Sequence, residues 1–141
     1  MTGFDRARWL ALLLPFGLLA GAYASQYLGG LYPCEMCWWQ RWPHFAALPL
    51  ALGAFILPGD AKRRLFTALA ALAILISGLI GSYHAGVEYG WWEGITTCSS
   101  TVTAESGKDV LDAILDAPLI RCDIAPWTLF GISLAGFNFL I

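Results

Sequence analysis

Four long apolar segments dominate the sequence and restrict what it can fold into. As helices, residues 9–28, 37–57 and 65–83 are each long enough to cross the roughly 30 Å hydrocarbon core of a bilayer. A fourth apolar segment covers 126–141; as a helix it would rise about 24 Å, which is short for a crossing. Only helices and closed barrels satisfy their backbone groups in lipid. The sequence therefore predicts an all-α fold, a four-helix transmembrane bundle forming one domain over residues 1–141.

Composition agrees with a lipid environment. The chain is 58% hydrophobic and 13% charged, against roughly 45–50% and 25% for soluble proteins. No basic patch suggests a nucleic-acid partner, and the net charge is only -2. One alternative for the first segment is a signal peptide, since Ala22-Tyr23-Ala24 resembles a cleavage site. Cleavage there would leave the cysteines on the same side of the membrane.

Charge placement predicts how the bundle is oriented. Five basic residues lie before the first span and in the turn at 58–64: Arg6, Arg8, Lys62, Arg63 and Arg64. The positive-inside rule places both segments in the cytoplasm and the loops at 29–36 and 84–125 outside. All four cysteines then lie on the outer side, at positions 34, 37, 98 and 122. In a bacterial inner membrane this side is the periplasm, where disulfides persist.

The long outer loop contains one segment with helical periodicity. Ser106 begins a Ser-x-x-acid pattern that is typical of a helix start. An apolar stripe then faces a row of aspartates, and its residues are Val110, Leu111, Ile114 and Leu115. We expect a short amphipathic helix, lying either along the membrane surface or, equally well, as a solvated helix that covers the domain.

A Cys-x-x-Cys pair stands where a polar connection turns into the second apolar helix. Arg41 follows Cys37 by four residues, so it lies on the same helix face. A cation and the positive end of a helix dipole both favour thiolate over thiol, and an arginine this close to an apolar run is costly without a task. Cys34 and Cys37 are thus predicted to carry redox chemistry. The alternatives are inert packing or a metal site using all four cysteines.

A dithiol on the oxidising side of a membrane needs an electron acceptor. The chain has no nucleotide-binding fingerprint and no C-x-x-C-H haem motif, because Trp38 follows Cys37. An acceptor dissolved in the bilayer remains, and we expect a quinone, either ubiquinone or menaquinone. Arg41 would stabilise negative charge on a quinone oxygen, and His84 would donate a hydrogen bond or a proton. Otherwise Arg41 snorkels to lipid headgroups or pairs with Glu35, and His84 is merely interfacial.

Motifs spread over essentially the whole chain resemble the disulfide bond formation protein B (DsbB) family. They are Pro33-Cys34-x-x-Cys37-x-x-x-Arg41, His84 followed by Gly86-Val87-Glu88, Trp91-Trp92 leading to Thr97-Cys98-Ser99, and Cys122 shortly before Pro126-Trp127. The joint pattern is far more restrictive than a lone C-x-x-C. The resemblance implies an inner-membrane oxidoreductase that reoxidises a periplasmic DsbA-like thioredoxin-fold protein and passes the electrons to quinone, as in the scheme known for this family.

The resemblance also implies a role for each cysteine. Cys98 would form the mixed disulfide with the partner, Cys122 would be its intramolecular partner and would exchange with Cys34, and Cys37 would face the quinone. Arg41 would lie beside the quinone headgroup, as would His84. A purely structural Cys98–Cys122 disulfide is an alternative. Two other functions stay open: a vitamin-K-epoxide-reductase-like quinone reductase, and a non-enzymatic metal-binding or assembly factor.

Overall fold

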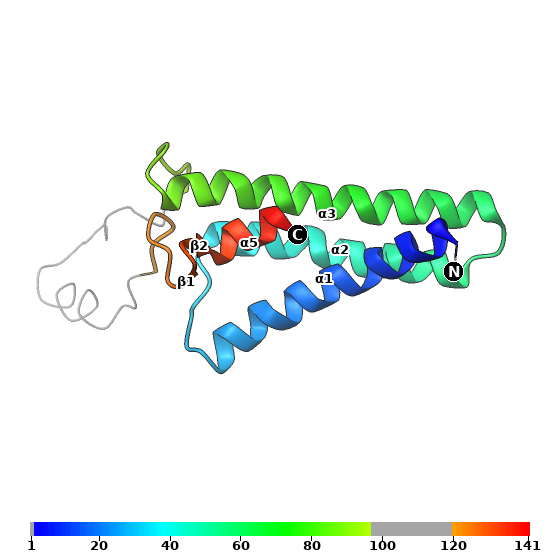
Figure 1. Ribbon diagram of the computed structural model, residues 1–141, viewed down its shortest axis with the longest axis horizontal. Coiled ribbons are helices and arrows are strands. Elements are labelled where there is room, and N and C mark those ends of the chain that lie inside the picture. Colours follow the sequence, from blue (N-terminus) through cyan, green and yellow to red (C-terminus); the bar gives the residue numbers. More distant parts are fainter. Residues whose placement is uncertain (1, 97–119) are drawn as a thin grey trace, which may run out of the picture.

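Three long helices form the body of the protein. The computed structural model describes residues 2–96 and 120–141. The helices and strands in this part are α1 (Gly3–Tyr27), α2 (Glu35–Ile56), α3 (Asp60–Glu88), β1 (Thr128–Leu129), β2 (Ile132–Ser133) and α5 (Leu134–Leu140). Figure 1 shows α1, α2 and α3 running along the long axis, with the short α5 beside α2 and α3. The closest packing is between α2 and α3, followed by α3 with α5 and α1 with α2.

Local signals in the sequence explain where the long helices begin and end. Thr2 caps α1 in a capping box with Asp5, so two backbone N–H groups are satisfied. Cys34 is the N-cap of α2, and its sulfur accepts from the backbone N–H of Cys37. Gly59, at φ 92°, allows a sharp reversal between α2 and α3. This turn is shorter than expected, so the basic residues at 62–64 lie in the first turns of α3.

Large apolar side chains lie on the outside of the bundle and small ones lie inside. The fully buried positions of α2 and α3 include Ala47, Ala51, Ala54, Ala70 and Ser77. Exposed residues on α1 and α3 include Leu10, Leu13, Phe16, Leu72, Leu75 and Leu79. This distribution is typical of helices that pack closely through small residues and face lipid with large ones.

Two helices of the described part, α1 and α3, are long and apolar enough to cross a membrane. The polar side chains of Gln40, Arg41 and His44 make the first half of α2 less apolar. The mostly helical, membrane-compatible fold agrees with the prediction, whereas four spans are not confirmed.

The two ends of the bundle differ in chemistry. At one end the Arg8 guanidinium donates to the carbonyl of Ala54 (3.3 Å), and Arg64 lies over the ring of Phe4. The chain start and the α2–α3 turn therefore lie together, as Figure 1 shows. Cys34 stands at the opposite end of α2. The basic residues and the Cys-x-x-Cys pair thus occupy opposite ends, as expected from the sequence.

The prediction of one helix over 126–141 is wrong. A β-hairpin comes first, pairing Thr128 with Ser133, and α5 begins only at Leu134. The reason is the turn: Phe130 and Gly131 have φ values of 52° and 78°, as a two-residue hairpin turn requires. The seven residues of α5 rise about 10 Å. The amphipathic helix expected near 106–116 lies outside the described residues, as does Cys98.

Candidate redox site

The Cys-x-x-Cys pair lies at the start of α2, where helix geometry brings both sulfurs together. Because Cys34 is the N-cap and Cys37 belongs to the first turn, their Sγ atoms are 3.0 Å apart, both as thiols. Cys34 is 5% exposed. Its hydrogen bond with Cys37 and its burial raise the pKa of the Cys34 thiol. Cys34 therefore keeps its proton in the reduced pair.

α3 contributes a histidine to the site, and the segment that begins at residue 120 contributes a third cysteine. The Nε2 atom of His84 lies 3.6 Å from Cys34 Sγ. Cys122 is 3% exposed and packs in one cluster with Cys34, Met36 and Val87, and its backbone hydrogen-bonds His84. The structure thus brings together three of the four predicted redox cysteines. The position of Cys98 stays a prediction.

Arg41 lies one turn beyond Cys37 and is almost completely buried. Its guanidinium donates to Gln26 Oε1 (2.7 Å) and to the carbonyl of Ala22 (3.3 Å). The rings of Tyr23 and Trp38 flank it, with centroids 4.9 and 5.0 Å away. Two polar partners and two aromatic faces fix this cation in place, so it is held inside the bundle and does not extend to the surface.

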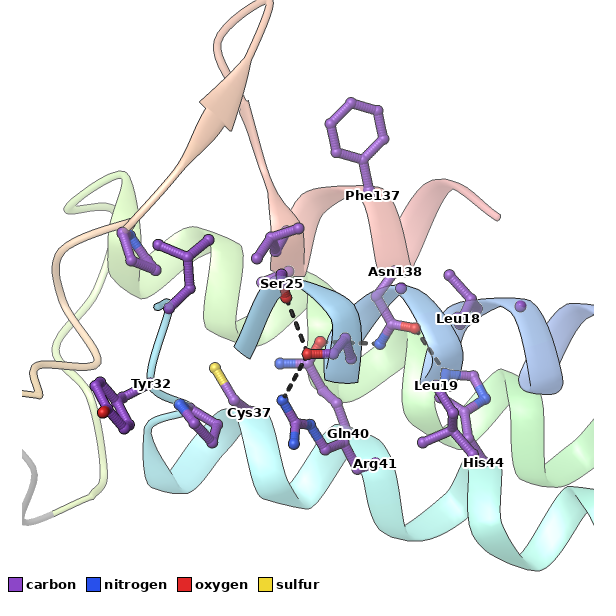
Figure 2. A pocket seen from close by; sticks show the side chains of 18 residues that line it. Leu18, Leu19, Ser25, Tyr32, Cys37, Gln40, Arg41, His44, Phe137 and Asn138 are labelled. Atoms are coloured by element: carbon purple, nitrogen blue, oxygen red, sulfur yellow. Dashed lines mark hydrogen bonds between the residues drawn. The ribbon is translucent and has the colours of Figure 1, made fainter. Parts of the chain in front are cut away.

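A cavity of about 200 Å³ opens beside Cys37 and Arg41, between α1, α2 and α5. Figure 2 shows Cys37, Arg41 and Gln40 on α2, and Asn138 reaching from α5 toward Gln40 and His44. Its other walls are largely apolar and include Leu18, Leu19 and Phe137. Since a cavity of about 150 Å³ can hold benzene, a single six-membered ring fits here.

A second cavity, of about 270 Å³, lies on the other side of the pair. It is lined by both cysteines and His84, and also by Glu88 and Arg121. Cys37 lines both cavities, of which the first is largely apolar and the second more polar.

A chain of polar side chains leads from His84 into the apolar part of the bundle. Gln40 contacts His84 Nδ1 at 2.8 Å and Asn138 at 2.9 Å. His44 Nε2 is 2.8 Å from Asn138 and 2.9 Å from the Ser77 hydroxyl. His44 Nδ1, on a residue that lines the apolar cavity, has no hydrogen-bond partner in the described part. This buried lone pair suits a ligand that carries a hydroxyl group.

Sequence reasoning named the cysteines, Arg41 and His84 as site residues, and His84 lines the second cavity; it did not name the residues that contact them. Gln40, Ser77 and Asn138 belong to the polar chain, and Glu88 shares a cavity with the sulfurs. The available signal was the presence of uncharged polar residues inside apolar segments, which are costly unless they pair with one another. His44, another polar residue of the second apolar segment, is buried in the core.

The ligand atoms of Cys34, Cys37 and His84 lie within 4.8 Å of one another, a spacing that would also suit a metal ion. However, Gln40 donates to Nδ1 of His84, which places the imidazole proton on Nε2, the nitrogen that faces the sulfurs. A ligating nitrogen must be unprotonated. The arrangement therefore favours thiol chemistry over a metal site.

Comparisons with known proteins point to one family. The family model for disulfide bond formation protein DsbB matches residues 5–141. A disulfide bond formation protein B from Chromohalobacter salexigens is 30% identical over 142 residues, covering 88% of this chain and 81% of its own. One from Polaromonas is 29% identical over 155 residues, covering 99% and 87%. An uncharacterized Rickettsia prowazekii protein is 27% identical over 126 residues, covering 87% and 72%. No solved structure matches.

Proposed function

Because this chain belongs to the DsbB family of disulfide bond formation proteins, we propose that it is a quinone-dependent thiol oxidase of the bacterial inner membrane. It takes two electrons from a periplasmic DsbA-like thioredoxin-fold protein and passes them through its cysteines to ubiquinone or menaquinone. Electrons enter at Cys98 and Cys122 and leave through Cys34 and Cys37. The vitamin-K-epoxide-reductase-like alternative is set aside, because the family model covers nearly the whole chain.

The observation that carries the proposal is the position of Cys37. Its side chain lines the apolar cavity together with Arg41, a buried cation that hydrogen bonds hold in place. A quinone supplies a ring that accepts two electrons and two protons, and the residues present fit such a ring. The cavity admits its size, Arg41 is placed to stabilise negative charge on one oxygen, and His44 Nδ1 can accept from a hydroxyl at the other end.

The packing around Cys34 supports electron entry from the other pair. Cys122 lies in the same buried cluster as Cys34, so a thiolate at one can attack a disulfide at the other after a small movement. Thiol–disulfide exchange needs such an approach and transfers two electrons at each step. When the partner dithiol is oxidised, the Cys98–Cys122 pair is reduced. Cys122 would then attack Cys34 to form a mixed disulfide and free the Cys37 thiolate, and Cys98 would attack Cys122, which frees Cys34 and re-forms the Cys98–Cys122 disulfide.

The difference between the two ends of the bundle supports the proposed orientation. The end with the chain start and the α2–α3 turn carries the basic residues, and we place it in the cytoplasm. The end that carries Cys34 and Cys122 then faces the periplasm. Impermeant thiol reagents should label a single remaining cysteine at position 98 only from the periplasmic side. Labelling only from the cytoplasm would contradict the orientation.

The central test compares two serine variants of the fully reduced protein, each mixed with a short-chain quinone. Cys37→Ser should abolish stoichiometric quinone reduction, since Cys37 is the cysteine that lines the apolar cavity and Cys34 and Cys122 do not line it. Cys122→Ser should retain a single turnover, because Cys34 and Cys37 are intact. Quinone reduction by the Cys37→Ser variant would refute the proposed electron route.

A second test examines the partner. Cys98→Ala should abolish the mixed disulfide with a reduced DsbA-like protein while leaving oxidation of Cys34 and Cys37 by quinone unaffected. A mixed disulfide that persists in this variant would overturn the assigned order.

A further inference from the structure

Glu88 is a buried carboxylate that the proposed electron route does not use. It is the last residue of α3, and its side chain is only 3% exposed. Its Oε1 lies 3.8 Å from His84 Nε2, and Ser133 supplies a hydrogen bond to the carboxyl. Its Oε2 is buried without a hydrogen-bond partner in the part of the chain that the structure describes. Such a group is costly to bury, which points to a task.

The cavity of about 270 Å³ connects Glu88 with both sulfurs. A water molecule occupies about 30 Å³ and needs polar partners, so this space can carry a proton between a thiol and the carboxylate. The other charged or titratable side chains that line the cavities beside Glu88 are Tyr32, Tyr89, Glu93, Arg121, Cys122 and Asp123. Arg121 is paired with Asp123, and no other cation among residues 2–96 and 120–141 lines either cavity beside Glu88.

The polar chain determines which nitrogen of His84 carries a proton. The Ser77 hydroxyl is 2.7 Å from the carbonyl of Gln40, which can only accept. One amide atom of Asn138 is 3.1 Å from the carbonyl of Ser77, so that atom must be the donor Nδ2. The same Nδ2 is 2.9 Å from Gln40, and this assigns the acceptor Oε1 of Gln40.

It follows that the other amide atom of Gln40 is a donor. This atom lies 3.3 Å from the carbonyl of Met36 and 2.8 Å from His84 Nδ1. His84 Nδ1 accepts, so the neutral imidazole has its proton on Nε2, which faces Cys34 and Glu88. A second proton on Nδ1 would point at the Gln40 donor. His84 is thereby held as a hydrogen-bond donor and cannot act as a base toward Cys34.

Since His84 is excluded, the geometry points to Glu88 as the residue that accepts the thiol proton of Cys34 when the Cys34–Cys37 disulfide forms. This inference rests on the proposed function. The proton passes from Cys34 to the Glu88 carboxylate, and the resulting thiolate forms the sulfur–sulfur bond with Cys37. The two electrons released go to the quinone. The quinone takes up two protons. In the overall reaction they equal the two protons that the thiols lose, one from Cys37 and one from Cys34 that Glu88 afterwards releases to water.

The test is Glu88→Gln, which keeps the shape and the hydrogen bond with Ser133 but cannot take up a proton. Glu93→Gln, the same change at an exposed nearby position, is the control. The reduced variants are mixed with a short-chain ubiquinone, and the single-turnover rate is followed between about pH 6 and pH 9. General bases contribute about 10²–10⁴-fold. We expect oxidation by Glu88→Gln to be at least about tenfold slower at pH 7 and to accelerate with rising pH, as hydroxide replaces the carboxylate.

Three outcomes separate this role from others. Glu88 as the proton acceptor is supported if Glu88→Gln is oxidised more slowly and with a steeper pH dependence than wild type. The variant should also unfold at the wild-type temperature or above, since a neutral amide is less costly to bury than a carboxylate. A rate and pH profile equal to those of Glu93→Gln overturn this role, as does a slower rate with an unchanged pH profile. If wild-type protein itself fails to reduce the quinone, the proposed function fails first, which is a separate result.

Discussion

Replacing Ser77 by alanine tests whether the polar chain holds the bundle together. The Ser77 hydroxyl is completely buried and contacts three groups: the carbonyl of Gln40 at 2.7 Å, His44 Nε2 at 2.9 Å and Asn138 Nδ2 at 3.0 Å. Hydrogen bonds between helices of membrane proteins average about 0.6 kcal/mol. Losing three removes about 2 kcal/mol, and the higher helix propensity of alanine returns about 0.5 kcal/mol. The expected loss of unfolding free energy is about 1–2 kcal/mol.

Ser82→Ala is the matched control. It lies in the same helix, gains the same helix propensity, and loses only an exposed bond to the carbonyl of Leu79. Both variants are unfolded reversibly in mixed detergent micelles and their unfolding free energies compared. Ser82→Ala should be neutral or slightly stabilising. If the unfolding free energies of the two variants differ by less than about 0.5 kcal/mol, the buried polar side chains around Ser77 stabilise the bundle no more than an exposed hydrogen bond does, and the reasoning is refuted.

The remaining predictions concern the close contact between Gly81 and α5, the buried cation Arg41 and the thiol of Cys34. A Cβ on Gly81 would lie 2.9 Å from a backbone oxygen of α5, whereas on Gly78 its nearest neighbour is at 3.7 Å. Gly81→Ala should therefore lose about 1–3 kcal/mol of unfolding free energy, while Gly78→Ala gains helix propensity; equal stabilities would contradict this packing. Arg41→Met should raise the half-saturating quinone concentration about 10–100-fold, as expected for a charge-assisted hydrogen bond, with Arg6→Met as the unaffected control. Because the pKa of Cys34 is raised, the reduced fold is favoured below the ordinary thiol pKa of about 8.5 and loses that advantage as pH rises. Site-resolved alkylation of Cys34 should keep accelerating above pH 8.5, and a plateau below it would contradict the raised pKa.

The sequence predicted the elements whose signals are local. Long apolar runs with clear stops gave α1, α2 and α3, and the Cys-x-x-Cys pair was correctly placed at the start of α2. The last segment failed because Pro126 is an acceptable helix start, and the following residues are apolar throughout. The hairpin there depends on the positive φ values of Phe130 and Gly131, which the apolar pattern of the sequence does not predict.

The support of the site depends on contacts that no local pattern contains. Gln40, Ser77 and Asn138 come from three helices and are far apart in the sequence. Each is visible as a polar residue in an apolar segment, but which residues meet depends on how α5 packs against α2 and α3. The same holds for Glu88, whose burial follows from the chain around Cys122 and Ser133.

Cys37 lines two cavities of different polarity, and this arrangement keeps the two substrates of the proposed reaction, the soluble partner protein and the quinone, apart. In the proposed route the soluble partner reacts with the Cys98–Cys122 pair and the quinone reacts with the Cys34–Cys37 pair, so the partner and the quinone do not need to touch each other. Substitutions that reshape the apolar cavity can therefore adapt the proposed oxidase to a different quinone while its recognition of the periplasmic partner is preserved.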